Sequence, residues 1–156
     1  MHGQADAVAD IRGGRDAPLL RGTVQFFQES DSVLVVAEIS GLPKGNETGF
    51  FALHIHEGKE CAGEGFSATG SHYDPAGKMH PVHAGDLPPL LMYRGDAYLA
   101  VRTARFRVKD ITGRTVVIHS GPDDFHTQPA GNAGVKIGCG VIRETRRPCK
   151  ACAQRV

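Results

Sequence analysis

Hydrophobic residues in this chain fall into short stretches that polar, turn-forming residues separate. Stretches rich in β-branched and aromatic residues cover 20–28, 32–40, 49–56, 97–108, 114–119 and 136–143. Short runs of this kind between turns are typical of β-strands, and 97–108 is long enough for one strand or two. Residues 29–31 predict a hairpin turn, and residues 41–46 interrupt the pattern with glycine and proline. The pattern predicts an all-β domain.

The composition supports this prediction and excludes some partners. The chain has 156 residues, including 20 glycines and 9 prolines. This length suffices for one domain with its own core, and abundant turn formers favour β-structure with substantial loops. The formal net charge is +1 with 22% charged residues, so no overall field favours nucleic acid or a membrane surface. No apolar run reaches membrane-spanning length. We therefore expect no nucleic acid and no membrane as partners.

The first residues of the chain bear on its location. They lack the basic region and the apolar region of a secretory signal. We therefore expect a cytoplasmic protein. The alternative is a periplasmic or secreted protein whose leader has been removed.

One long segment, residues 57–96, shows almost no hydrophobic periodicity. A loop of this length inside a small domain usually serves a function. It carries His72, His80, His83, Asp86 and Cys61. A turn can close His80, His83 and Asp86 around one tetrahedral ion with His72 as the fourth ligand, a donor set that suits zinc. The alternative is a group of surface histidines that cluster by accident.

Three further histidines lie in predicted strands. His54 and His56 are two residues apart and so point to the same face of a strand. This arrangement suits two ligands of one metal, although two exposed polar residues would give the same pattern. His119 ends a strand rich in Val and Ile, and alone it is more typical of a capping or packing residue. Imidazole favours zinc, copper, iron and nickel. The chain thus offers nitrogen ligands for two metal ions.

These histidines stand within a set of motifs that resembles the copper–zinc superoxide dismutase family. The motifs are FALHIHE at 51–57, GSHYDP at 70–75, HAGDL at 83–87, GRTVVIH at 113–119, GNAG at 131–134 and GCGVI at 138–142. The resemblance covers residues 20–143. It implies a flattened eight-stranded Greek-key β-barrel, an immunoglobulin-like sandwich with long metal-binding and active-site loops. Residues 1–19 then form an N-terminal extension and residues 144–156 a polar C-terminal tail.

The resemblance also implies an activity and a ligand set. The expected reaction converts superoxide to dioxygen and hydrogen peroxide at a His-bridged copper–zinc centre. The matched positions imply His54, His56, His72 and His119 as copper ligands and His72, His80, His83 and Asp86 as zinc ligands. His72 would bridge the two metals and take part in catalysis. The resemblance is compatible with a homodimer and selects no surface for one.

Asp123 and two cysteines have structural roles in the resemblance. Asp123 would link His54 to His80 and so fix the orientation of both rings; a solvated turn acid is the alternative. Cys61 and Cys139 would form the intrachain disulfide of the family. A disulfide is unexpected in a reducing compartment, so two free thiols are the alternative.

Two features depart from the family pattern. Lys136 occupies the position of an arginine that attracts and orients superoxide, and lysine keeps the charge but loses the planar fork. We expect a lower rate, unless Lys136 is merely a strand-edge residue. Cys149 and Cys152 form a C-x-x-C pair that suits copper(I) or a redox disulfide, although incidental tail cysteines would look the same. Both features support an alternative function, a dismutase-like copper/zinc-binding protein for metal storage or delivery with little turnover.

Overall fold

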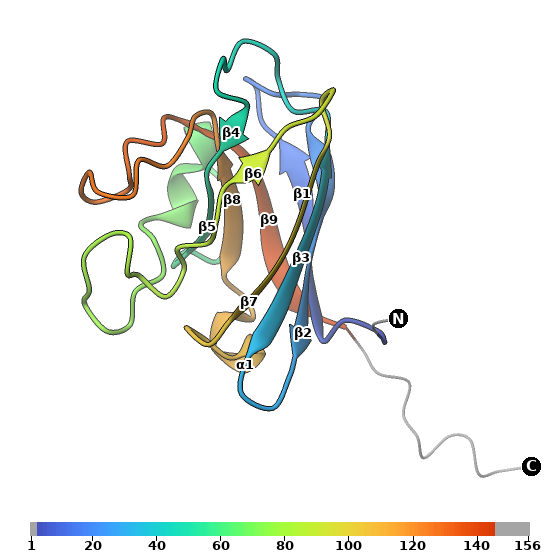
Figure 1. The fold of residues 1–156 in the computed structure, drawn as a ribbon, viewed down its shortest axis with the longest axis vertical. Coiled ribbons are helices and arrows are strands. Elements are labelled where there is room, and N and C mark those ends of the chain that lie inside the picture. The colour runs from blue at the N-terminus through green and yellow to red at the C-terminus, as the bar shows by residue number, and fades with distance from the viewer. Residues whose placement is uncertain (1–2, 146–156) are drawn as a thin grey trace, which may run out of the picture.

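The computed structural model describes residues 3–145, and most of the regular structure in this range is β-strand (Figure 1). The strands are β1 Ala7–Gly13, β2 Arg21–Gln28, β3 Val33–Ser40, β4 Phe50–Phe51, β5 Leu53–His56, β6 Leu90–Leu91, β7 Ala97–Thr103, β8 Thr115–His119 and β9 Lys136–Glu144. Two short helical segments accompany them, the 3-10 helix η1 at Glu64–Thr69 and α1 at Val108–Ile111. None of the described helices is long and apolar enough to cross a membrane.

Seven strands form one curled antiparallel sheet in the order β5-β8-β9-β1-β2-β3-β7 (Figure 1). β4 pairs separately with β6. Only Ala52 separates β4 from β5, so the two can be counted as one strand that turns from one sheet to the other. Counted in this way the described chain has eight strands, and the predicted all-β barrel is confirmed.

The core follows the alternation of side chains along the strands. In β2, Val24 and Phe26 are fully buried, whereas Thr23 and Gln25, which precede them, are only half-buried. Successive residues of a strand point to opposite faces, so one face of the sheet packs into the barrel. This packing fixes the register of β2 against its neighbours, because a slip of one residue would expose Val24 and Phe26.

Part of the predicted N-terminal extension, residues 1–19, belongs to the sheet. Ala7–Gly13, within the predicted extension 1–19, forms β1 and pairs with both β2 and β9. Ala7, Ala9 and Ile11 are all fully buried. Two of these three residues are alanines, which give a weak hydrophobic signal, so the alternation was missed.

The stretch 97–108 is neither one long strand nor two short ones. β7 ends at Thr103, and α1 begins at Val108. The side chain of Asp110 accepts a hydrogen bond from the Arg107 backbone N–H at 3.0 Å, which caps this helical turn. The chain leaves the sheet here and crosses to β8.

Two long loops lie on the same side of the sheet, next to β5 and β8 (Figure 1). One connects β5 to β6, and the other connects β8 to β9. Residues 146–156, which include Cys149 and Cys152 and most of the predicted tail, lie outside the described residues. The site is therefore built from two neighbouring strands and the two loops beside them.

Candidate metal centre

The long loop pairs with the free edge of β5. Tyr73 N–H donates to the Ile55 carbonyl, and Ile55 N–H donates to the Gly85 carbonyl, both at 2.8 Å. Bridges form between His56 and His72 and between residues 54 and 86. Backbone pairing along one strand edge thus places the loop residues next to the two histidines of β5.

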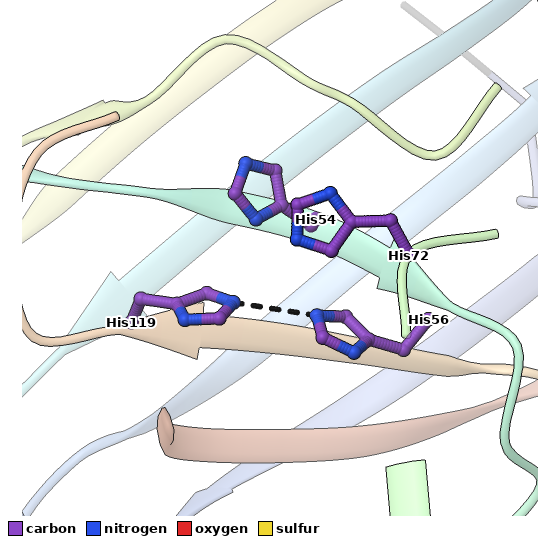
Figure 2. A group of neighbouring side chains, drawn as sticks. All are labelled: His54, His56, His72 and His119. Carbon is purple, nitrogen blue, oxygen red and sulfur yellow. Dashed lines mark hydrogen bonds between the residues drawn. The ribbon is translucent and has the colours of Figure 1, made fainter. Parts of the chain in front are cut away.

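Four imidazoles converge at this edge. Figure 2 shows His54 and His56 from β5, His119 from the end of β8 and His72 from the loop, with their rings gathered together. All four are buried. One nitrogen from each lies within 4.8 Å of those of the other three. We call these residues the first ligand group.

In three of these rings, one nitrogen makes a hydrogen bond outside the group, which leaves the other nitrogen without a proton. His54 Nε2 donates to Asp123 Oδ2 at 2.8 Å, and His56 Nδ1 donates to the Gly70 carbonyl at 2.8 Å. His119 Nδ1 donates to the Gly134 carbonyl at 3.3 Å. A neutral imidazole carries one proton, so the opposite nitrogen of each ring holds a lone pair.

These lone pairs point into the centre of the group. His56 Nε2 and His119 Nε2 face each other at 3.3 Å, the interaction drawn in Figure 2. His54 Nδ1 and His72 Nε2 are buried without any hydrogen-bond partner. Buried polar atoms are normally satisfied, and several lone pairs aimed at one point repel each other unless a cation lies between them. The four histidines therefore fit a metal ion.

A second ligand group adjoins the first and shares His72. Its members are His72, His80, His83 and Asp86, all buried, with ligand atoms within 4.8 Å of one another. Asp86 lies at its centre: its Oδ1 is 2.7 Å from His72 Nδ1, and its Oδ2 is 3.1 Å from His80 Nδ1 and 3.2 Å from His83 Nδ1. Three imidazoles and one carboxylate form the closed donor set of a structural zinc site.

Asp123 connects the two groups. Its Oδ2 accepts from His54 Nε2 and its Oδ1 accepts from His80 Nε2, both at 2.8 Å. Burial alone would raise the pKa of Asp123, but the hydrogen bonds from the two histidines outweigh it and hold this pKa well below its usual value. The carboxylate therefore stays ionised and directs the free nitrogens, Nδ1 of both rings, inward.

Gly131 leaves room for this connection. A Cβ at this position would overlap Asp123 Oδ1 and His80 Nε2, and the residue has a φ of 70°. Both facts require glycine here. Gln128 also holds the second group: its Oε1 accepts from the His80 N–H at 2.9 Å, and its Nε2 donates to the His80 carbonyl at 2.6 Å. No sequence pattern indicated the role of Gln128, because its partners are backbone atoms.

Burial keeps three histidines of the first group, His54, His56 and His119, neutral. It lowers the pKa of His56 to about 2. Burial, reinforced by the neighbouring His54, lowers the pKa of His119 to about 3. The pKa of His54 is lowered as well, chiefly by burial. Neutral imidazole is the form that binds a metal, so these side chains are ready to act as ligands at neutral pH.

Lys136 lies at the start of β9, beside the first group. Its Nζ donates to Thr69 Oγ1 at 2.8 Å and to the Gly70 carbonyl at 3.0 Å. The same carbonyl accepts the hydrogen bond from His56. Burial lowers the pKa of Lys136. Lys136, His56, His72 and His119 all line a cavity of about 660 Å³, through which a small molecule can reach the first group.

The predicted disulfide is confirmed. Cys61 and Cys139 are bonded, with their Cα atoms 5.8 Å apart. The bond attaches the loop that carries His72 to β9 in the sheet. Every histidine and aspartate that the sequence indicated as a ligand or linker lies in this centre.

Two groups that could each hold a metal ion and that share one histidine, on a β-barrel and its loops, fit the class of binuclear metalloproteins. Comparison with known proteins identifies the family. The sequence profile described as copper/zinc superoxide dismutase (SODC) matches residues 20–142. The chain belongs to the copper/zinc superoxide dismutase family.

Individual relatives agree with this assignment. Superoxide dismutase [Cu-Zn] 2 of Aquifex aeolicus is 36% identical over 137 residues, which cover 78% of each chain. Superoxide dismutase [Cu-Zn] 3 of Arabidopsis thaliana is 34% identical, covering 90% of this chain and 91% of the relative. Superoxide dismutase [Cu-Zn] of Caulobacter vibrioides is 31% identical, covering 89% and 85%. Copper and zinc are the cofactors of this family, and superoxide is its substrate.

Proposed function

We propose that the protein dismutates superoxide at a copper–zinc centre. In this proposal the first ligand group holds copper and the second holds zinc. One observation carries the proposal of a bridged centre: the two ring nitrogens of His72 face the two groups separately, Nε2 toward the first and Nδ1 toward Asp86 in the second. Copper, when bound, supplies the one-electron redox chemistry by which two superoxide ions and two protons give dioxygen and hydrogen peroxide.

His72 is the residue to which we assign a proton. Formation of hydrogen peroxide consumes protons, so a group that lines the cavity must be able to hold one near the substrate. His72 Nε2 is buried, lacks a hydrogen-bond partner and belongs to a residue that lines the cavity. Its other nitrogen is fixed beside Asp86 at 2.7 Å, so the ring keeps its place whether Nε2 carries a proton or not.

Lys136 is the residue to which we assign binding of the anion. Among the described residues that line the cavity it is the one lysine or arginine. Its two hydrogen bonds hold the ammonium group beside His56, where a point charge attracts superoxide without the bidentate geometry of arginine. Glu57 and Asp74 line the same cavity. We therefore expect only weak steering of an anion from a distance.

The test is the dismutation rate of protein loaded with one copper and one zinc per chain, measured at low and moderate salt. A fast rate that falls with salt supports the proposal. His54→Ala should abolish turnover and leave zinc bound, because His54 belongs to the first group alone. A rate no higher than that of free-metal controls, with both metals firmly bound, would favour the storage or delivery function instead.

The remaining expectations about partners are proposals as well. We propose that the protein acts in the cytoplasm, without nucleic acid or a membrane as a partner. We also propose that it can form a homodimer. Sedimentation velocity of the metal-loaded protein tests the oligomeric state, and fractionation of cells tests the compartment.

A further inference from the structure

Arg105 contacts the segment of the second ligand group from the barrel side. Its Nη1 donates to the carbonyls of Pro81, His83 and Asp86 at 3.0, 3.2 and 3.1 Å. Two of these three carbonyls belong to the ligand-bearing residues His83 and Asp86, and the third belongs to Pro81, which directly follows His80. One guanidinium nitrogen thus binds backbone carbonyls along most of the segment 80–86.

The contact has a clear physical consequence for the ligands. The side chains of His80, His83 and Asp86 converge on one point, and the backbone carbonyls of the same turn converge on Arg105. Converging carbonyl dipoles repel one another, and a charged N–H donor is the strongest available compensation. Without that donor, repulsion between the carbonyl dipoles would favour opening of the turn while no metal is bound.

Arg105 is itself attached to the barrel wall. It follows the end of β7, and its backbone N–H donates to Thr103 Oγ1 at 3.2 Å. The next residue, Phe106, is buried in the core. Arg105 is absent from the lining of the substrate cavity and lines a separate cavity of about 390 Å³, together with Arg102. It therefore acts on the ligands through their backbone, without access to the substrate.

We propose that Arg105 is a positioning residue for zinc, which holds segment 80–86 closed so that His80, His83 and Asp86 are arranged before the metal arrives. The inference rests on the proposed function in taking this segment as the zinc half of the centre. The copper half does not need such a clamp, because three of its four histidines lie on paired strands.

The experiment compares Arg105→Gln with Arg102→Gln. Arg102 lines the same cavity and carries the same charge, but its guanidinium binds Glu29 instead, at 2.8 Å. Zinc affinity is measured by competition with a chelator at fixed pH. We expect Arg105→Gln to weaken zinc binding by roughly 10- to 100-fold, the usual effect of removing a group that orients metal ligands. Arg102→Gln should bind zinc like the unchanged protein.

A second readout reports the geometry of the ligands. Cobalt(II) placed in the zinc site gives intense visible absorption when its ligands are tetrahedral. These bands should be weaker and shifted in Arg105→Gln and unchanged in Arg102→Gln. Arg105→Lys keeps the charge but replaces the guanidinium with an ammonium group on a shorter side chain, so it should lie between the two. A change confined to overall stability would leave the cobalt spectrum of the bound metal as it is.

The outcomes separate this inference from the function on which it rests. Equal zinc affinity and an identical cobalt spectrum in Arg105→Gln would overturn the inference, as would equal losses in both glutamine variants. If the unchanged protein itself binds no zinc, the proposed function fails. Amide hydrogen exchange across residues 80–86 in the metal-free proteins then still tests the clamp, which requires faster exchange in Arg105→Gln alone.

Discussion

Replacing Asp123 by asparagine tests the link between the two halves of the centre. The carboxylate accepts three hydrogen bonds: its Oδ2 accepts from His54, and its Oδ1 accepts from His80 and from the Phe125 backbone N–H. Asparagine keeps the size of the side chain but has a single acceptor oxygen. An oxygen in the place of Oδ1 keeps two of the three bonds, whereas one in the place of Oδ2 keeps a single bond. We therefore expect His54 Nε2 to lose its acceptor, which leaves the ring free to carry its proton on Nδ1, the nitrogen that faces the metal.

The magnitude follows from the bond that is lost. A hydrogen bond to a charged, buried carboxylate contributes about 1.5–3 kcal/mol. Since about 1.4 kcal/mol corresponds to a factor of ten, the affinity of the first ligand group for copper should fall by roughly 10- to 100-fold. His80 keeps its acceptor, and Gln128 also holds its backbone. Zinc affinity should therefore fall by less than copper affinity does.

The assay measures the affinity for each metal separately, by competition with a chelator at neutral pH. Asp124→Asn is the matched control, because Asp124 is the adjacent acid and contacts only its own loop, at His126 and Thr127. Loss of zinc with retention of copper in Asp123→Asn would refute the reasoning, since it would mean that the asparagine oxygen faces His54 and not His80.

Three further predictions concern other parts of the structure. Lys136→Arg should raise the dismutation rate at low salt; an unchanged or lower rate would place Lys136 outside the path of the substrate. Because the pKa values of His56 and His119 are lowered to about 2 and about 3 from 6.5, the unfolded chain binds more protons below pH 6.5. Urea unfolding of metal-free protein should therefore show that the free energy of unfolding decreases as the pH decreases below 6.5, by about 1.4 kcal/mol per pH unit for each of these histidines. A free energy of unfolding that stays constant between pH 6 and pH 4 would contradict this. Replacing Cys61 and Cys139 by alanine should cost about 2–5 kcal/mol in the same assay under oxidising conditions, and equal stability would show that the disulfide does not constrain the unfolded chain.

The sequence indicated the residues that gather in the centre better than it indicated the strands around them. Histidine and aspartate reveal their chemistry by type and spacing, so His54, His56 and the segment 80–86 could be recognised directly. The strand β1 was missed because alanine at 7 and 9 gives a weak signal, although both are fully buried. Its place in the sheet depends on β2 and β9, which are remote in the chain.

Residues that act through the backbone left no trace in the sequence. Arg105 and Gln128 both hold the segment 80–86, and their partners there are carbonyl or N–H groups that every residue possesses. Nothing in the spacing of an arginine or a glutamine shows which backbone group it will meet. Only the folded chain brings these residues to the ligands, so sequence reasoning finds a metal site more readily than it finds the supports of that site.

The two halves of the centre are therefore stabilised by different means. In the first ligand group, the ladder between β5 and β8 and the hydrogen bond from the His119 N–H to the Ala52 carbonyl hold His54, His56 and His119, and these backbone bonds exist whether or not a metal is bound. In the second group the ligands lie in a loop, and their arrangement depends on a few side chains, among them Gln128 and Arg105. Because removing either of these side chains affects the loop before it affects the strands, such substitutions should weaken metal binding by the second group first. His72 is the exception, since it belongs to both groups, and its loss should weaken both sites together.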